Sequence, residues 1–422
     1  MQRVQGESSA SESGESSPQC PVDHVVWSRQ KTARAVEPVD LPVEHDAAGV
    51  WHIRGFAEAR AVLRSGDTKQ AGFGAEVFEK YLQTENPGIL YKEGPGHHEQ
   101  RRKTARFFTP KAVSANYRPM MEQQADSLAA NLQREKRGDL SQIALAMAVQ
   151  TAALVVGLTN SPLRGMTRRL ESFFENQTLV ETDSHLPKFI ENLRFAWGQR
   201  RMTLFYFLDV RPAIKARRRQ LQDDVISHLI TQGYNDTEIL TECVTYAAAG
   251  MVTTREFISV AAWHFLEQPE LRERYLAAPE EERYELLHEV LRLEPVLGHL
   301  YRRTTADVAL ESNGAPVTIP QGALLDVHLC AANADESIVG EHRLELCPGR
   351  ALKQENIPSM LMSFGDGHHR CPGAYIAIQE TDILLQRLLA LRSLRMEQTP
   401  VLRWNEISAG YELRSLLLRV DG

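Results

Sequence analysis

The chain has 422 residues, 43% of them hydrophobic, and a formal net charge of −7 at pH 7. A chain of this length can bury a large core, and its negative charge argues against a nucleic-acid-binding protein. No run of about 18 apolar residues occurs, so we expect no membrane span. The Ser- and Glu-rich start lacks the apolar segment of a signal peptide, and five widely spaced cysteines do not indicate a disulfide framework. These features predict a soluble, cytoplasmic protein.

The N-terminal part of the chain changes character along its length. Residues 1–20 are of low complexity and are predicted to be disordered. Further on, Val50–Ile53 has the composition of a strand and Phe56–Leu63 that of a short helix, which indicates a small sheet lobe. Residues 65–95 are rich in glycine and mixed in pattern, which is typical of a long irregular segment with a functional role.

A basic helix is predicted from His97 to just before Pro110. Within it, His97 and Arg101 are four residues apart and therefore share one face. An arginine on such a face is well suited to bind a carboxylate. A basic face that is simply solvated is the commoner meaning of such a run, so both interpretations stay open.

The longest predicted helix covers residues 236–266 and can begin with a cap at Asn235. In its middle, Gly250 costs the helix about 1 kcal/mol relative to alanine, which calls for a reason. With the Thr253 hydroxyl three residues later, the missing side chain could leave a local groove for dioxygen and a water molecule. A glycine that packs against another helix is the alternative.

The last third of the chain first shows an amphipathic helix and then strands. On the helix Glu285–Leu293, Glu289 and Arg292 are three residues apart and face the same way, a common arrangement on helices. The strand-like segments alternate with Gly and Pro turns. They lie at residues 305–310, 316–319, 323–329 and 396–421.

The segment Phe364–Gly373, Phe-Gly-Asp-Gly-His-His-Arg-Cys-Pro-Gly, is a Gly-rich loop, and an apolar helix-forming run follows it over residues 374–389. A cysteine at the start of a helix lies near unpaired N–H groups and the positive end of the helix dipole, so we expect a lowered pKa for Cys371. The thiolate is the form of cysteine that binds metal. Phe364 could lie beneath the sulfur and exclude water. The loop therefore predicts a thiolate metal ligand, with a buried free cysteine as the alternative.

The spacing Phe364-x-x-Gly367-x-x-x-Cys371-x-Gly373 resembles the haem-binding loop of the cytochrome P450 superfamily, and further motifs of that family occur upstream in the same order. The resemblance is to its soluble bacterial members. It implies a mainly α (α+β) fold, with one large domain over residues 21–422 that has a helical lobe and a smaller β-rich lobe. It also implies haem b with Cys371 as axial ligand, and a pocket lid within residues 173–207.

The resemblance further implies which side chains hold the haem propionates. His97 and Arg101 would bind one propionate, and Arg302 would bind the second. Arg303 is an alternative to Arg302, because the register of that segment is not fixed by the sequence. His369, two residues before the cysteine, is another candidate.

Two other regions acquire roles through the same resemblance. Glu289 and Arg292 would form a buried ion-pair network that braces the haem-binding loop from beneath. Residues 296–300 would line the substrate pocket. His299 could hydrogen-bond a substrate there, although a structural histidine with satisfied hydrogen bonds is the commoner case.

The proton supply is where the chain departs from the family pattern. Thr253 matches the threonine of the helix over the haem, but Val252 stands where the family has an acid, and valine cannot carry protons. Glu256 lies one turn further on the same face. It could help Thr253 and water deliver protons, or it could serve in a structural ion pair.

The resemblance implies a monooxygenase that inserts one oxygen atom from O2 into an apolar, medium-sized molecule such as a natural product, steroid, terpenoid or fatty acid. No flavin or iron–sulfur domain fits the sequence, so electrons would come from separate partners, a ferredoxin and its reductase. A haem-thiolate enzyme that uses peroxide, or that catalyses oxidative coupling or rearrangement, is the alternative. A non-catalytic haem protein is a third, weaker one. We expect a monomer.

Overall fold

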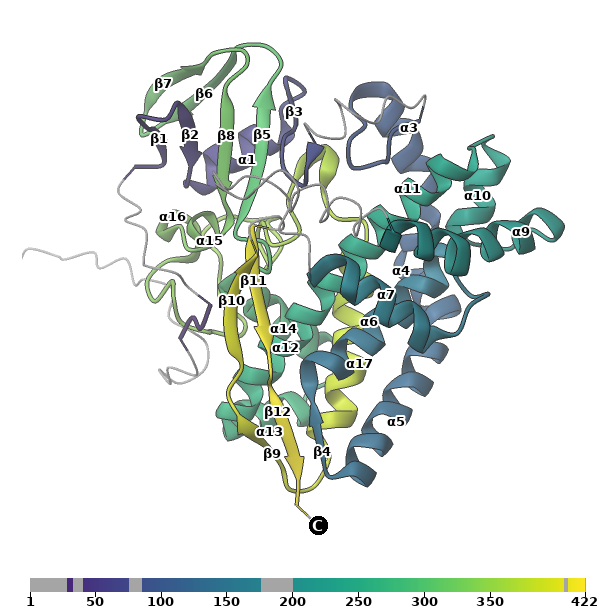
Figure 1. The fold of residues 1–422 in the computed structure, drawn as a ribbon. Coiled ribbons are helices and arrows are strands. Elements are labelled where there is room, and N and C mark those ends of the chain that lie inside the picture. Colours follow the sequence, from purple (N-terminus) through teal and green to yellow (C-terminus); the bar gives the residue numbers. More distant parts are fainter. Residues whose placement is uncertain (1–28, 33–40, 76–85, 176–199, 406–408, 422) are drawn as a thin grey trace, which may run out of the picture.

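The computed structural model describes residues 29–32, 41–75, 86–175, 200–405 and 409–421 (Figure 1). The predicted disordered tail, residues 1–20, lies outside the described residues, and so does most of the expected lid segment, residues 173–207. The boundary between the tail and the domain therefore stays a prediction.

Helices form the larger lobe, at the right and bottom of the view in Figure 1. Helix α6 contains the apolar run from Ala144 to Val156 and is buried along most of its length, because nearly all of its faces are hydrophobic. No helix in the described part of the chain is both long and apolar enough to cross a membrane. The main helices of the described chain are α3 (Gly94–Thr104), α5 (Arg118–Glu135), α6 (Leu140–Val156), α7 (Leu163–Glu175), α9 (Arg211–Arg219), α10 (Val225–Thr231), α11 (Asp236–Ala247), α12 (Thr253–Glu267), α13 (Pro269–Ala277), α14 (Glu280–Leu293) and α17 (Ala374–Leu389).

The smaller lobe is built on a five-stranded sheet with the order β1-β2-β8-β5-β3. Strands β2 and β8 are parallel, whereas β8 and β5 are antiparallel. Helix α1 (Phe56–Arg64) packs with this sheet in a shared hydrophobic cluster. The strands are β1 (Val43–His45), β2 (Val50–Ile53), β3 (Thr68–Gln70), β5 (His299–Thr304) and β8 (Leu324–His328).

The remaining described elements are short. Two are antiparallel hairpins, β6 with β7 and β10 with β11, and one is a three-stranded sheet in the order β4-β12-β9. Together with β8, these strands confirm the strand-like segments expected after residue 304, and the elements as a whole confirm a mainly helical fold with a smaller β-rich lobe. Their bounds are β4 (Arg137–Asp139), β6 (Val308–Ser312), β7 (Ala315–Ile319), β9 (Leu394–Gln398), β10 (Val401–Asn405), β11 (Gly410–Arg414), β12 (Leu417–Val420), α4 (Pro110–Ala112), α15 (Leu329–Asn333) and α16 (Glu336–Val339).

The two lobes have separate hydrophobic cores, and the segment around the Gly-rich loop contributes to both. Leu361 and Met362, just before the loop, are buried with α1 and the five-stranded sheet. Phe364, Tyr375 and Ile376 belong to the core of the helical lobe. The loop therefore lies at the junction of the two cores.

Candidate active site

The Gly-rich loop is closed by its own backbone. The N–H of Cys371 donates to the carbonyl of Phe364 over 2.9 Å, which joins the two ends of the loop. Gly367 has a positive φ of 66°, and a Cβ there would lie 2.1 Å from the backbone oxygen of Leu63 at the end of α1. Only glycine fits this position, because both its backbone conformation and the close approach of α1 exclude a side chain.

The thiol of Cys371 lies three residues before α17, as the sequence predicts. Its side chain is exposed, yet protein atoms crowd it, and this loss of hydration raises its pKa. A hydrogen bond from the Gly373 N–H and the charges of Arg101 and Arg370 lower the pKa by less. The expected net fall in the pKa of Cys371 is therefore wrong for the protein alone, because desolvation outweighs the helix start.

The other described cysteines differ in state. Cys243 and Cys330, like Cys371, are not in a disulfide. Cys347 is disulfide-bonded, although the wide cysteine spacing gave no indication of a disulfide. This leaves three thiols in the described chain, of which Cys371 alone is exposed.

Four candidate propionate ligands gather near the loop. His97 is 1% exposed, and its Nδ1 is buried with no hydrogen-bond partner. Its ring stacks on that of His369, with the ring centres 4.2 Å apart. Burial, with the charges of His369 and Arg101, lowers the pKa of His97 to about 3. Its imidazole is therefore held neutral and is short of one hydrogen-bond partner.

His369 and Arg101 extend this group toward the loop. The Nε2 of His369 lies 2.9 Å from the carboxylate of Glu93. Arg101 donates to the carbonyl of Arg370, and burial lowers its pKa while the nearby Cys371 raises it. The predicted helix face with His97 and Arg101 is thus turned toward the loop and is not simply solvated.

The two arginine alternatives, Arg302 and Arg303, lie on opposite faces of the sheet, because successive side chains of strand β5 alternate between its faces. Arg302 is 4% exposed and donates to the side chain of Gln70 and to the carbonyl of Tyr301. No ion pair joins it to a carboxylate in the described chain, and burial lowers its pKa to about 10. Arg303 faces the other way and donates to the carbonyl of Gly322. The geometry favours Arg302.

These side chains fit the cofactor implied by the loop. A buried cation without a carboxylate partner and a buried imidazole nitrogen without a hydrogen bond are both rare in a stable protein, because each costs free energy. Two haem propionates would satisfy Arg302 and His97. An exposed thiol with an N–H donor at its sulfur is a suitable axial ligand.

The long predicted helix is present but has a wide turn at its centre. Between α11 and α12, residues Ala248–Val252 form one π-helical turn, a feature that is frequent at functional sites. The Thr253 hydroxyl donates to the carbonyl of Ala249 over 2.5 Å, and Ala249 is exposed within this mostly buried helix. A Cβ on Gly250 would lie 3.4 Å from the Cβ of Ala152 in α6. Gly250 therefore also serves the contact between these two helices.

The side chain of Glu256 is held by three hydrogen-bond donors. Its carboxylate accepts from the Arg255 guanidinium over 2.8 Å, from the Arg414 guanidinium over 2.7 Å and from the Leu413 N–H over 2.7 Å. Glu256 is 1% exposed. Both oxygens of this carboxylate are therefore occupied by donors of the protein. The arrangement favours the structural alternative for this residue.

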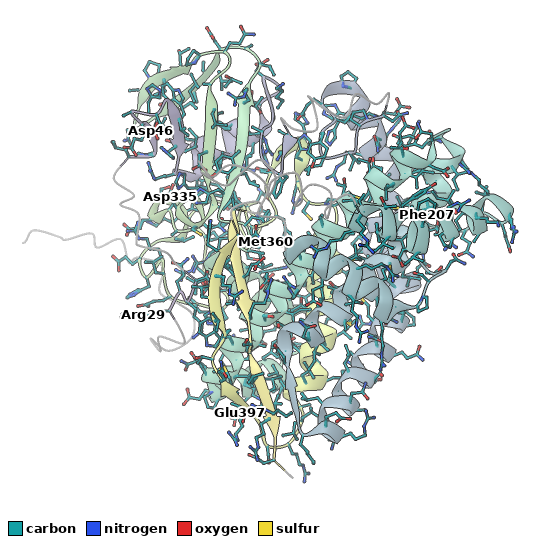
Figure 2. All side chains as sticks on the ribbon, in the orientation of Figure 1. Arg29, Asp46, Phe207, Asp335, Met360 and Glu397 are labelled. Atoms are coloured by element: carbon teal, nitrogen blue, oxygen red, sulfur yellow. The ribbon has the colours of Figure 1, made fainter. Side chains whose placement is uncertain are left out.

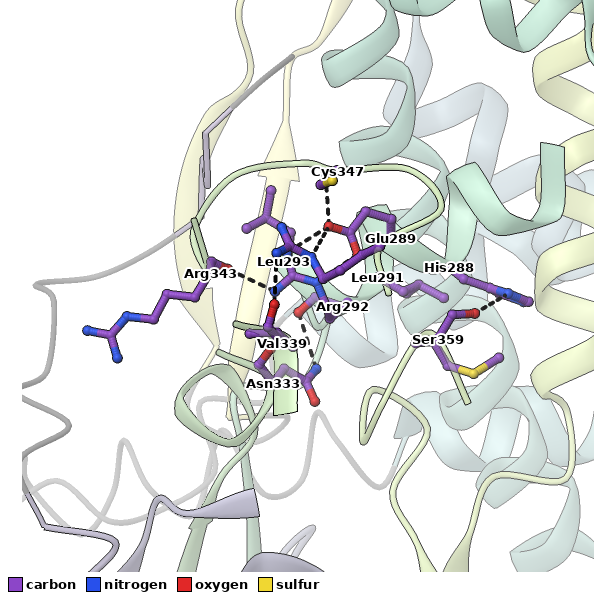
Figure 3. Close-up of polar contacts among 12 residues, drawn as sticks. His288, Glu289, Leu291, Arg292, Leu293, Asn333, Val339, Arg343, Cys347 and Ser359 are labelled. Carbon is purple, nitrogen blue, oxygen red and sulfur yellow. Dashed lines mark hydrogen bonds and ion pairs between the residues drawn. The ribbon is translucent and has the colours of Figure 1, made fainter. Parts of the chain in front are cut away.

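Glu289 and Arg292 form the predicted buried ion pair, with two hydrogen bonds of 2.7 and 2.9 Å (Figure 3). Glu289 also accepts from the Cys347 N–H over 2.9 Å and from the Arg350 guanidinium over 3.2 Å. Arg292 donates to three backbone carbonyls. They are those of Asn333, Arg343 and Glu345.

The ion pair reaches the Gly-rich loop through Asn333, and the sequence does not identify this intermediate. The Asn333 amide donates to the Arg292 carbonyl over 3.2 Å and to the Ser363 hydroxyl over 2.8 Å, and its oxygen accepts from the Met362 N–H. The brace expected beneath the loop therefore acts one step away, on the residues that precede Phe364.

Glu380 is a second residue that the sequence does not reveal. It lies on α17, is 2% exposed, and burial raises its pKa to about 7. The hydroxyls of Thr151 and Thr254 approach it closely enough to oppose that shift. Its Oε2 nevertheless has no partner with hydrogen-bond geometry. Periodicity places Glu380 on a helix but does not distinguish an interior acid from a surface acid.

The chain is similar to known proteins along most of its length. Residues 52–277 and 285–407 match the family described as Cytochrome P450. The Biotin biosynthesis cytochrome P450 of Bacillus subtilis is 26% identical over 86% of this chain and 88% of its own length. The Erythromycin C-12 hydroxylase of Saccharopolyspora erythraea is 26% identical over 83% of both chains.

Solved structures give the same fold. The structure of P450BioI in complex with an acyl carrier protein ligated to hexadec-9Z-enoic acid has a TM-score of 0.71 at 24% identity, and covers 88% of this chain and 91% of that one. CalO2 has a TM-score of 0.72 at 22% identity, over 90% of this chain and 93% of its own.

Proposed function

The chain belongs to the cytochrome P450 family of haem-thiolate oxidoreductases, and from this premise we propose that it inserts one oxygen atom from O2 into an apolar, medium-sized molecule. The proposed cofactor is haem b, with Cys371 as the axial thiolate ligand. The observation that carries the proposal is Cys371 at the end of the closed loop, with the Gly373 N–H at its sulfur. A haem bound through a thiolate supplies the activation of O2.

The cationic and imidazole groups around the loop have a separate role in this proposal. Arg302 and the neutral ring of His97 bind the two propionates, and Arg101 and His369 complete the polar edge of the site. Binding removes the unsatisfied hydrogen-bonding groups described above, so the same contacts that orient the haem also stabilise the folded chain.

Thr253, at the start of α12, is the residue that would carry protons to a bound haem. Its hydroxyl is held by the Ala249 carbonyl and can accept a hydrogen bond from water, so it can position and pass a proton. Glu256 is the weaker partner, because its oxygens are occupied by Arg255 and Arg414. We expect Thr253→Ala to lower the product formed per electron consumed and Glu256→Gln to act mainly on stability. Unchanged product yield in Thr253→Ala would remove this route.

A peroxide-driven or other haem-thiolate reaction is the second candidate, and Val252 favours it. Val252 has no proton to transfer, and the oxygens of Glu256 are occupied by Arg255, Arg414 and the Leu413 N–H, whereas hydrogen peroxide supplies two protons and two electrons with its oxygen. Turnover with peroxide alone, compared with turnover driven by NAD(P)H through redox partners, separates the two candidates.

The proposal also covers the electron donors and the substrate. We propose separate donors, a ferredoxin and its reductase. The relatives carry names as unlike as Biotin biosynthesis cytochrome P450 and Erythromycin C-12 hydroxylase, so the substrate class stays broad: a natural product, steroid, terpenoid or fatty acid. A screen of such compounds against the ferric protein, read by the spectral change when water leaves the iron, identifies ligands.

The axial ligand is tested by substituting cysteines one at a time. The ferrous carbon monoxide complex of the haem-loaded protein should show the red-shifted absorption band that a thiolate ligand causes. Cys371→His should abolish that band while haem remains bound. Cys330→Ala is the matched control, since Cys330 is also a cysteine outside any disulfide. Persistence of the band in Cys371→His would reject Cys371 as the ligand.

A further inference from the structure

Away from the haem site, one face of the five-stranded sheet carries a cluster of histidine and aspartate side chains. His52 of β2 is paired in register with Asp326 of β8, and His299 of β5 lies opposite His328 of β8. Asp326 and His328 are two residues apart on one strand, so their side chains point to the same face. Three strands that are distant in sequence therefore bring four polar side chains together.

We propose that His52, Asp326 and His328 bind a divalent transition-metal ion, Zn²⁺. The Nδ1 of His52 lies 2.9 Å from the Nε2 of His328, and the Oδ2 of Asp326 lies 3.2 Å from the same Nε2 and 3.4 Å from that Nδ1. Two ligands of a tetrahedral zinc ion, each about 2.0–2.1 Å from it, are roughly 3.3 Å apart. The three atoms therefore converge at the spacing that the ion requires, and the fourth position is left for water.

His52 and Asp326 each have a further polar contact, of the kind that orients metal ligands in zinc proteins. The other ring nitrogen of His52, Nε2, lies 3.1 Å from the carboxylate of Asp46. The second oxygen of Asp326, Oδ1, lies 2.8 Å from the Nδ1 of His299. In metalloproteins, a carboxylate that accepts the remaining imidazole N–H fixes the tautomer that binds the metal, and a ligating carboxylate is itself hydrogen-bonded.

The charge and exposure of the cluster also suit a cation. The Asp326 carboxylate lies 2.8 Å from the Nδ1 of His299 and 3.2 Å from the Nε2 of His328. Asp326 and Asp46 together balance a charge of +2. Asp326 and His328 are nearly buried, while His52 and Asp46 are 20% and 31% exposed, so an ion can enter from the side of Asp46. Figure 2 labels Asp46 at the outer edge of this lobe.

In the alternative to a metal site, the same three side chains share a proton and bind no ion. A single N–H at Nε2 of His328 would then be shared between the Nδ1 of His52 and the Oδ2 of Asp326. A zinc ion would coordinate all three atoms at once and would link β2 to β8, which are separated by more than 270 residues in the chain. The ion should therefore stabilise the β-rich lobe in proportion to its binding.

The test uses the full chain loaded with haem, treated with a chelator and then titrated with ZnCl₂. We expect one zinc ion per chain after gel filtration, and a melting temperature that rises with the zinc concentration. X-ray absorption at the zinc edge, which the haem iron does not disturb, should show nitrogen and oxygen ligands at about 2.0–2.1 Å. Absence of bound zinc would overturn the proposal.

Variants locate the ion. His52→Ala and Asp326→Asn should lose the bound zinc, and Asp46→Asn should weaken its binding by about 10- to 100-fold while keeping one site. His98→Ala is the control, because His98 and His368 also bring two imidazole nitrogens together, 2.8 Å apart. Zinc retained by His52→Ala and lost by His98→Ala would reject the assignment. If His52→Ala does not fold, unchanged zinc affinity in Asp46→Asn would reject it as well.

Discussion

At the scale of single residues, two buried carboxyl groups stand out because burial outweighs every hydrogen bond and charge that favours their ionised form. Burial raises the pKa of both Glu380 and Glu242 to about 7. Glu380 lies on α17, nine residues after Cys371, and it approaches Thr254, which neighbours Thr253. A change in the protonation of Glu380 near neutral pH can therefore change the stability of the helical lobe.

Glu380 should make stability depend on pH. Its pKa is about 7 in the folded chain and 4.5 in the reference state, so between these values the folded chain keeps a proton that the unfolded chain has lost. The free energy of unfolding should therefore fall as the pH rises from 4.5 to 7, by about 3 kcal/mol in total, and then level off. Glu380→Gln should remove this contribution in urea titrations of the haem-loaded protein, whereas the contribution of Glu242, whose pKa burial also raises to about 7, should remain.

The exposed Glu135→Gln is the control for that measurement. It should leave the pH dependence of unfolding unchanged, because its side chain is 64% exposed. If Glu380→Gln retains the full slope between pH 4.5 and 7, the carboxyl does not titrate in this range.

Arg302 and Arg303 provide a paired test of the haem edge. Arg302→Gln should weaken haem binding by about 10- to 100-fold, the value of one charge-assisted hydrogen bond, because the haem propionate would lose its cationic partner. Arg303→Gln should leave haem binding unchanged, since its guanidinium points to the Gly322 carbonyl. Transfer of haem to an excess of a haem-binding protein measures both. The reverse order of effects would favour Arg303.

At the scale of elements, α14 acts on the Gly-rich loop through a chain of hydrogen bonds. Glu289 and Arg292 are both nearly fully buried, and the loop is reached through Asn333 and Ser363. The sequence predicts the ion pair from its spacing, since a helix repeats every 3.6 residues. It does not predict Asn333, because that contact joins segments about 40 residues apart and has no periodic signal.

Glu289→Ala should cost about 3–5 kcal/mol and give protein that does not retain haem, because Arg292 would be left as an uncompensated buried charge. Chemical denaturation and the haem content after purification measure the effect. Glu280→Ala, which breaks the half-exposed pair with Arg118, is the control and should cost less than about 1 kcal/mol. A stable, haem-loaded Glu289→Ala protein would contradict the proposed brace.

At the scale of the whole molecule, the Gly-rich loop joins two hydrophobic cores. Residues before it pack with the sheet lobe and residues within and after it pack with the helices, so the cofactor site lies at the junction of the two lobes. The end of α1 rests on the loop at Gly367. Small changes at this contact should therefore affect both lobes together.

Gly367→Ala and Gly365→Ala separate close approach from backbone conformation. Both glycines have a positive φ, but a Cβ on Gly367 would collide with the Leu63 carbonyl, whereas one on Gly365 would lie 3.6 Å from Leu300. We expect a loss of about 3 kcal/mol or more for Gly367→Ala and of about 1–2 kcal/mol for Gly365→Ala. Equal losses in urea unfolding would mean that the contact with α1 contributes nothing.

The sequence predicts much of the fold and of the haem site because their signals are local. The helix over residues 374–389 and the helical span over residues 236–266 follow from periodicity, and Cys371 from its motif. The direction of the Cys371 pKa shift could not be predicted, because desolvation depends on how the loop is packed. The His52, Asp326 and His328 cluster is equally invisible, because it forms only when three strands pair.

The wide turn at Ala248–Val252 bears on how this chain can change over evolutionary time. A π-helical turn contains one residue more than the same length of α-helix, so it is what a single inserted residue leaves behind when both ends of a helix are already fixed by packing. Here α11 and α12 both contact α6, and α12 also contacts α17. Loss of one residue from the wide turn would restore regular winding, whereas loss of one residue within α12 would rotate its buried face by about 100°. An insertion or deletion is therefore tolerated best at this wide turn. It would change the surroundings of Thr253 while the packing of α11 and α12 is kept.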